Sequence, residues 1–161
     1  MKYLILVRHG KDKIEGDLSD EGKEQIARLT DSLKSIIPAG SIVKVLTSRI
    51  TRARQSAELI MGNLNLSELN EAPILSSNLN IHDPKIMVRL RKFAAFVKKE
   101  SARVDVLILV THFPQTELFP PYYGSKVVKT SGFLSCGAEN GEAVLICCEE
   151  KSCRLIPAKQ A

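Results

Sequence analysis

The sequence contains no tryptophan, and aromatic residues make up only 5% of its 161 positions. Nucleic-acid-binding surfaces combine clustered basic residues with stacking rings. Here the net charge is +5, from 23 Lys and Arg against 18 Asp and Glu, and the bases are not gathered into one tail. Long apolar runs are also missing, because residues 3–7 and 106–110 fall far short of the roughly 20 residues that cross a bilayer. The sequence therefore predicts neither a nucleic-acid partner nor a membrane partner.

The sequence lacks the motifs that would give its cysteines a chemical role. The four cysteines are Cys136, Cys147, Cys148 and Cys153, without the C-x-x-C spacing of a zinc site. Arg8 and His9 interrupt the first apolar run too early for a secretory signal. We therefore expect a cytoplasmic protein. Its cysteines are expected to be free thiols packed in the fold, with metal binding or redox chemistry as the alternative. No G-x-G-x-x-G follows the first apolar run, which argues against a dinucleotide-binding protein.

The order of apolar patterns predicts one α/β domain over residues 1–161. We expect a layered fold in which helices flank a mostly parallel central sheet, with a C-terminal antiparallel hairpin. The expected strands are residues 3–7, 42–46, 104–110, 142–149 and 153–156, and the expected helices are residues 20–36, 52–61 and 84–100. Ser19 is the expected cap of the first helix, and Asp83 with Pro84 the expected start of the third. Residues 63–82 are expected to be mostly loop, and residues 119–124 to be a loop.

Polar clusters follow three of the predicted strands. Arg8 and His9 come after the first, Arg52 lies near the start of the helix after the second, and His112 follows the strand at 104–110. Ligands of open α/β sheets bind at the carboxyl ends of the strands, so we expect these side chains to meet at one edge. Two guanidiniums suit phosphate oxygens, one imidazole can attack phosphorus, and the other can donate to the oxygens. We expect Gly10 to leave room for a ligand.

These clusters lie in segments that resemble the histidine phosphatase superfamily, the phosphoglycerate-mutase-like proteins. Residues 6–10 (LVRHG) resemble the family's opening motif, and residues 18–25 (LSDEGKEQ) its L-[ST]-x-x-G-x-x-Q segment. Residues 47–57 (TSRITRARQSA) are similar to its S-S-P-x-x-R-A-x-Q-T-A segment, and residues 110–112 (VTH) match its second histidine motif. The chain resembles the small phosphohistidine phosphatases of the family in two respects, its short length and the proline that follows Phe113.

The resemblance implies a site and a chemistry. It implies His9 as the phosphorylated nucleophile, Arg8, Arg52 and His112 as the rest of the phosphate pocket, and no metal or other cofactor. It also implies a sandwich of helices around a mixed sheet. Arg49 stands where the family usually has a proline, outside the phosphate ligands.

The proton donor is the main departure from the family pattern. Many members carry a glutamate after the second helix that protonates the leaving oxygen, whereas this chain reads LNIHD at residues 79–83. His82, Asp83 and Glu117 are the candidates that remain. Each has an alternative explanation, because Asp83 also suits a helix cap and the other two also suit a solvent-exposed surface.

The sequence thus predicts a metal-independent phosphatase that works through a phosphohistidine. Its partner would be a phosphorylated small molecule or a phosphoprotein. A missing acid favours good leaving groups, such as phosphohistidine or aryl phosphates, over sugar phosphates. The alternatives are a phospho-ligand-binding pseudoenzyme and a phosphomutase, the latter disfavoured because the short chain leaves little length for a second anion site.

Overall fold

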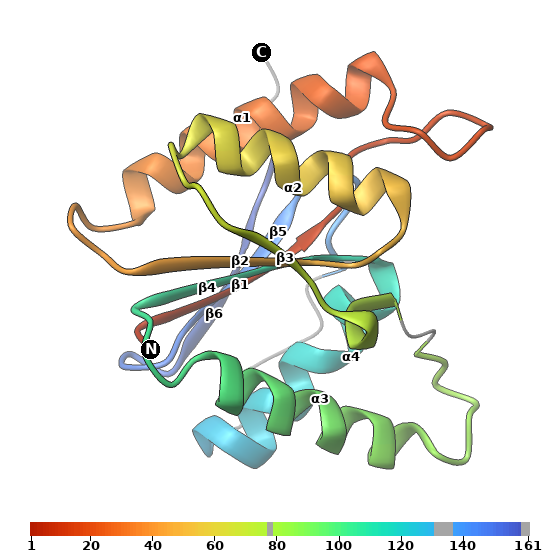
Figure 1. The fold of residues 1–161 in the computed structure, drawn as a ribbon. Coiled ribbons are helices and arrows are strands. Elements are labelled where there is room, and N and C mark those ends of the chain that lie inside the picture. Colours follow the sequence, from red (N-terminus) through yellow and green to blue (C-terminus); the bar gives the residue numbers. More distant parts are fainter. Residues whose placement is uncertain (77–78, 131–136, 159–161) are drawn as a thin grey trace.

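A mixed sheet with helices on both faces organises the computed structural model, which describes residues 1–76, 79–130 and 137–158 (Figure 1). The strands are β1 (Tyr3–Arg8), β2 (Val43–Thr47), β3 (Leu69–Glu71), β4 (Val106–Thr111), β5 (Ala143–Cys147) and β6 (Ser152–Ile156). The helices are α1 (Asp20–Ile36), α2 (Thr51–Asn63), α3 (Ile86–Glu100) and α4 (Phe113–Tyr123). A 3₁₀-helix spans Pro73–Ser76, and a π-helix spans Gly124–Val128.

The strand order is β3-β2-β4-β1-β5-β6. The first four strands in this order run parallel to one another, whereas β5 and β6 are antiparallel to their neighbours. This arrangement confirms the predicted α/β class with a mostly parallel sheet and a C-terminal antiparallel hairpin. The central strands β1 and β4 are covered on both faces, which explains why their sequences are continuous apolar runs.

Alternate residues of the central strands face two separate cores. Ile5 and Val7 of β1 pack in the core under α1 and α2, whereas Leu4 and Leu6 pack in the core under α3 and α4. Figure 1 shows α1 and α2 together on one side of the sheet and α3 with α4 on the other. Because helices pack against both faces of β1 and β4, the carboxyl ends of these two strands are held in fixed positions.

The helix starts agree with the sequence in one case and differ in another. Ser19 caps α1, since its side chain accepts a hydrogen bond from the Gly22 amide at 3.0 Å. Helix α3, however, begins at Ile86 and not at Pro84. Asp83 Oδ1 accepts from the Lys85 amide at 2.8 Å, so this carboxylate closes a turn just before the helix. The helix therefore begins two residues later than predicted, a difference within the usual uncertainty of a helix end.

The prediction of a loop at residues 119–124 is wrong, because helix α4 continues through Pro120 and Pro121. Each proline removes a backbone donor and disfavours the helix interior. The packing opposes this cost, since Phe119 is fully buried and its ring lies 4.3 Å from that of Phe93 and 5.2 Å from that of Tyr123. Burial of these aromatic rings outweighs the local preference of the two prolines.

Cys147 and Cys148 are free cysteines at the end of β5, and Cys136 lies outside the described residues. Burial raises the pKa of the Cys148 thiol, and such a thiol is less reactive than an ordinary one. Within the described ranges, no helix combines the length and the apolar character needed to cross a membrane.

Candidate active site

The ends of β1 and β4 bring two histidines together. His9 follows β1 and donates its backbone N–H to the carbonyl of Thr111 at 3.1 Å, and His112 follows Thr111. The centroids of the two imidazole rings lie 5.2 Å apart, with the ring planes inclined at 61°. Arg52 reaches the same point from the first turn of α2. A pocket of about 270 Å³ lies here, lined by Arg8, His9, Asp12, Arg52, His112, Phe113, Pro114 and Asn140.

The hydrogen bonds of His9 define its tautomer. Arg52 Nε, which can only donate, lies 2.9 Å from His9 Nε2, so Nε2 is the unprotonated acceptor. The other nitrogen, Nδ1, lies 2.8 Å from the Gly10 carbonyl oxygen and donates to it. Burial lowers the pKa of His9, and the charges of Arg52 and Arg8 lower it further against the raising effects of the Gly10 bond and of Asp12. His9 is therefore neutral, with a lone pair on Nε2.

His112 is held by a chain of serines. Its Nε2 lies 2.9 Å from Ser48 Oγ, which in turn lies 2.8 Å from Ser76 Oγ. Burial lowers the pKa of His112 to about 4, and the charges of His9, Arg52 and Arg8 add to this effect. Both imidazoles at the site are therefore uncharged at neutral pH.

The low pKa of His112 makes folding stability depend on pH. Below pH 6.5 the unfolded chain protonates this residue while the folded chain does not, so stability falls as the pH drops from 6.5 towards 4. We expect His112 to account for a loss on the order of 2 kcal/mol over this range. Urea unfolding at pH 7 and pH 4.5 measures it, with His112→Gln losing correspondingly less stability than the parent. An identical loss in the two proteins would contradict the assignment.

Buried polar atoms without a partner converge on the same pocket. Among the described residues, Arg8 Nε, His112 Nδ1 and Asn140 Oδ1 are buried without a hydrogen-bond partner. Each such atom costs about 1–3 kcal/mol unless something bonds to it, and such costs are typical of ligand sites. The N-termini of α2 and α4 also begin at this pocket, and their free amides favour negative charge. The pocket is therefore suited to an anion with several acceptor oxygens.

Two pocket residues, Asp12 and Asn140, were not predicted from the sequence. Asp12 Oδ2 lies 3.5 Å from Arg52 Nη1, and its charge raises the pKa of both histidines. Asn140 precedes β5, which pairs antiparallel with β1 so that Ala143 lies beside Val7. The sequence analysis predicted the hairpin but not its pairing with β1, and it is this pairing that brings the loop before β5 to the carboxyl edge of the sheet.

The family-like segment at residues 18–25 braces the loop that carries His9. Gln25 Oε1 accepts from the Lys11 amide at 2.9 Å, and Ser56 Oγ of α2 accepts from the Gly10 amide at 3.1 Å. The interpretation of Gly10 as room for a ligand needs correction. A Cβ at Gly10 would collide with the backbone carbonyl of Gly22, so glycine is required there by close packing of the loop on α1.

The three candidates for the proton donor lie in different places. Glu117 lines a neighbouring pocket, whereas His82 and Asp83 line neither that pocket nor the one at His9. His82 is exposed. Asp83 Oδ2 forms an ion pair with Arg89 Nε at 2.8 Å, in addition to its bond to the Lys85 amide. The structure thus brings none of the three into the pocket that holds the two histidines.

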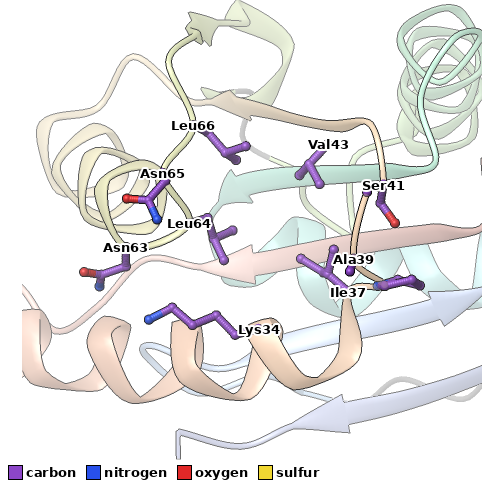
Figure 2. A pocket seen from close by; sticks show the side chains of 11 residues that line it. Lys34, Ile37, Ala39, Ser41, Val43, Asn63, Leu64, Asn65 and Leu66 are labelled. Atoms are coloured by element: carbon purple, nitrogen blue, oxygen red, sulfur yellow. The ribbon is translucent and has the colours of Figure 1, made fainter.

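A larger pocket, of about 320 Å³, lies at the opposite edge of the sheet (Figure 2). It is bounded by the C-terminal ends of α1 and α2, where helix dipoles disfavour anions. Its charged residue, Lys34, pairs with Asp31 at 3.1 Å. Nothing in this lining matches the polar chemistry of the His9 pocket. Over the residues that the structure describes, no cluster of three or more His, Cys, Asp or Glu side chains has a geometry that would hold a metal ion.

The fold and the pocket define an α/β protein with a pocket suited to an anion at the carboxyl edge of its parallel strands. Residues 4–76 match the family model described as "Histidine phosphatase superfamily (branch 1)". This match confirms the resemblance that the motifs indicated. No curated protein sequence matches the chain.

Solved structures share the fold over nearly the whole chain. A mycobacterial glucosyl-3-phosphoglycerate phosphatase is 16% identical, with a TM-score of 0.65 and 100% of each chain covered. A phosphoglycerate mutase from Plasmodium falciparum is 20% identical, with a TM-score of 0.61, covering 96% of this chain and 88% of that one. The candidate phosphohistidine phosphatase SixA from Agrobacterium tumefaciens is 15% identical, with a TM-score of 0.58 and coverage of 96% and 95%.

Proposed function

We propose that this chain is a metal-independent phosphatase that forms a covalent phosphohistidine on His9. The tautomer of His9 carries the proposal: a proton fixed on Nδ1 by the Gly10 carbonyl and an unprotonated Nε2 facing Arg52. Family membership of the matched segment and the fold of the solved relatives support a phosphoryl-transfer function.

In the first step, the Nε2 lone pair of His9 attacks phosphorus and the bond to the leaving oxygen or nitrogen breaks. Arg52 Nε donates to that lone pair before substrate binds, so the incoming phosphoryl oxygens must take over its N–H. Arg8 and Arg52 then hold the oxygens as forked donors. His112 is the further donor in the tautomer in which Nε2 accepts a hydrogen bond from the Ser48 hydroxyl and Nδ1 carries the ring proton.

In the second step, water attacks the phosphorus of the phosphohistidine. A new P–O bond forms, the P–N bond breaks and its electron pair returns to His9 Nε2, while both protons of the water leave with the phosphate as H₂PO₄⁻. The Gly10 carbonyl keeps Nδ1 protonated and stabilises the positive ring of the intermediate. Charge stabilisation and positioning supply most of the acceleration, because the phosphoryl transition state is loose.

A hydrolase fits the neighbouring surface better than a mutase does. A mutase must retain a displaced phosphorylated product, which calls for a second group of cations. The pocket next to the histidines is lined by Leu79, Asn80, Ile81, Phe113, Pro114, Glu117 and Leu118. This lining includes a carboxylate and neither lysine nor arginine, so it is poorly suited to a second phosphate.

Trapping of the intermediate tests the proposed function. The protein is mixed with phenyl phosphate labelled in its phosphoryl group, quenched in alkali within milliseconds, and digested. We expect label that is stable in base and labile in acid, in the peptide that contains His9. Binding of inorganic phosphate with no labelled protein and no phenol released would instead assign the phospho-binding alternative.

Asp12 is proposed to position Arg52, and not to protonate the leaving group, because it pairs with the guanidinium. Without an acid, the phenol must leave as its anion, so the rate should fall steeply as the pKa of the leaving phenol rises. Asp12→Asn should slow all aryl phosphates to a similar degree, with Asp31→Asn on α1 as the control. If Asp12→Asn slowed only the hydrolysis of aryl phosphates with poor leaving groups, Asp12 would be the acid.

A further inference from the structure

A second pocket adjoins the pocket of the two histidines. It has a volume of about 270 Å³ and shares Phe113 and Pro114 with its neighbour. The centroid of the Phe113 ring lies 5.1 Å from the guanidinium carbon of Arg8, so one face of the ring is turned towards the pocket of the two histidines. A group bonded to a phosphoryl moiety held by Arg8 would extend past Phe113 into the second pocket.

The walls of this second pocket are largely apolar. Leu79 in its lining is buried, whereas Ile81 and Phe113 keep 66% and 39% of their surface exposed. Large apolar side chains exposed beside a polar site are typical of ligand-binding surfaces. Helix α4 presents Phe113 and Glu117 one turn apart on one face, and Pro114 and Leu118 likewise, opposite residues 79–81.

The charge of the second pocket differs from that of the first. Glu117 is half-buried in its lining, and within residues 1–76, 79–130 and 137–158 no cation forms an ion pair with it. Neither lysine nor arginine belongs to this lining. An anionic group placed here would meet an uncompensated carboxylate, whereas a neutral or cationic group would not.

We propose that this pocket is a leaving-group subsite, defined by Leu79, Ile81, Phe113 and Glu117, that accepts a planar apolar ring and selects against negative charge on it. The term leaving-group subsite rests on the proposed function. The preference for an apolar ring without negative charge concerns binding alone and can be measured without turnover. Ile81 and Phe113 cover the ring, and Glu117 sets the charge preference as a specificity residue.

Phosphonates test the subsite without turnover, because their P–C bond is not hydrolysed. Binding of methylphosphonate, phenylphosphonate, 4-(aminomethyl)phenylphosphonate and 4-carboxyphenylphosphonate is measured by calorimetry. We expect the phenyl compound to bind about tenfold more tightly than the methyl compound, through burial of apolar surface. We expect the aminomethyl compound to exceed the carboxy compound by roughly tenfold or more.

Two variants separate the apolar and the charged contributions. Glu117→Gln should bring the aminomethyl and carboxy compounds to within about threefold of each other, while Glu149→Gln, in the turn between β5 and β6 at the far end of the sheet, should leave the ratio unchanged. Ile81→Asn should remove most of the phenyl advantage and leave methylphosphonate binding unaltered.

The outcomes distinguish failure of the subsite from failure of the proposed function. Equal affinity for the two charged ligands in the parent protein, or an unchanged ratio in Glu117→Gln, overturns the subsite even if the protein is an active phosphatase. The expected affinities without a trapped phosphohistidine support the subsite and overturn the covalent mechanism. Failure to bind any phosphonate overturns both, because the subsite requires an anchored phosphoryl group.

Discussion

Replacing His9 with asparagine is expected to reduce turnover of phenyl phosphate by roughly 10⁴-fold or more and to abolish labelling of the protein. Asparagine has no nitrogen lone pair that can attack phosphorus, although it is polar and smaller than the histidine it replaces. The His9 ring bonds to the Gly10 carbonyl and to Arg52, and His9 is not among the residues of either apolar core, so the substitution removes polar contacts at the edge of the sheet and leaves the core packing intact. We therefore expect the thermal unfolding midpoint of His9→Asn to remain within a few degrees of the parent.

His82→Asn is the matched control for this experiment, because His82 is exposed and lines neither pocket. It changes the same residue type and should retain activity within about threefold. If His9→Asn were to keep substantial activity while folded, the nucleophile would have to be another group. A loss of activity in His82→Asn comparable to that in His9→Asn would point to the segment before α3 as part of the catalytic site.

Arg52→Ala is expected to lower kcat by roughly 10²-fold or more, the usual scale for losing one charge-stabilising donor. The substitution removes the N–H that faces His9 Nε2 and the guanidinium that pairs with Asp12. Arg52→Lys should recover little, because an ammonium group cannot reproduce the forked geometry of a guanidinium. Steady-state kinetics with phenyl phosphate measures these effects.

Arg49→Ala provides the comparison three residues away. Arg49 is largely exposed and its Nε lies 3.7 Å from Glu71 Oε2, so its removal breaks a surface ion pair of small value. We expect its kcat to stay within about threefold of the parent. Equal losses in the two variants would mean that the motif at residues 47–57 is aligned incorrectly and that the arginine facing His9 is not the phosphate ligand.

The sequence was sufficient to predict the fold and the convergence of the main side chains. Continuous apolar runs marked β1 and β4 as central strands, and their carboxyl ends place His9 and His112 at the same edge. This inference works because strand burial is a property of local composition and because parallel strands end at a common edge. Arg52 followed in the same way from its position in the first turn of α2.

Features that depend on loop conformation or on distant packing could not be predicted in this way. Asp12 enters the pocket because the loop after His9 turns back, and the contact of Gly10 with Gly22 depends on how that loop packs on α1. The helix through Pro120 and Pro121 depends on aromatic contacts with α3, which local propensity does not contain. The pairing of Asp12 with Arg52 likewise joins residues forty positions apart.

The proposed nucleophile follows one of the two central strands, whereas the proposed leaving-group subsite includes a turn outside the sheet. The backbone of His9 is tied to Thr111 between β1 and β4, and amides in such strands exchange with solvent only when most of the molecule opens. Ile81 belongs instead to an exposed turn before α3, outside the hydrogen-bonded sheet. In the proposed subsite, we expect substitutions in that turn to alter which leaving groups fit at little cost to folding, while the pocket of the two histidines stays unchanged.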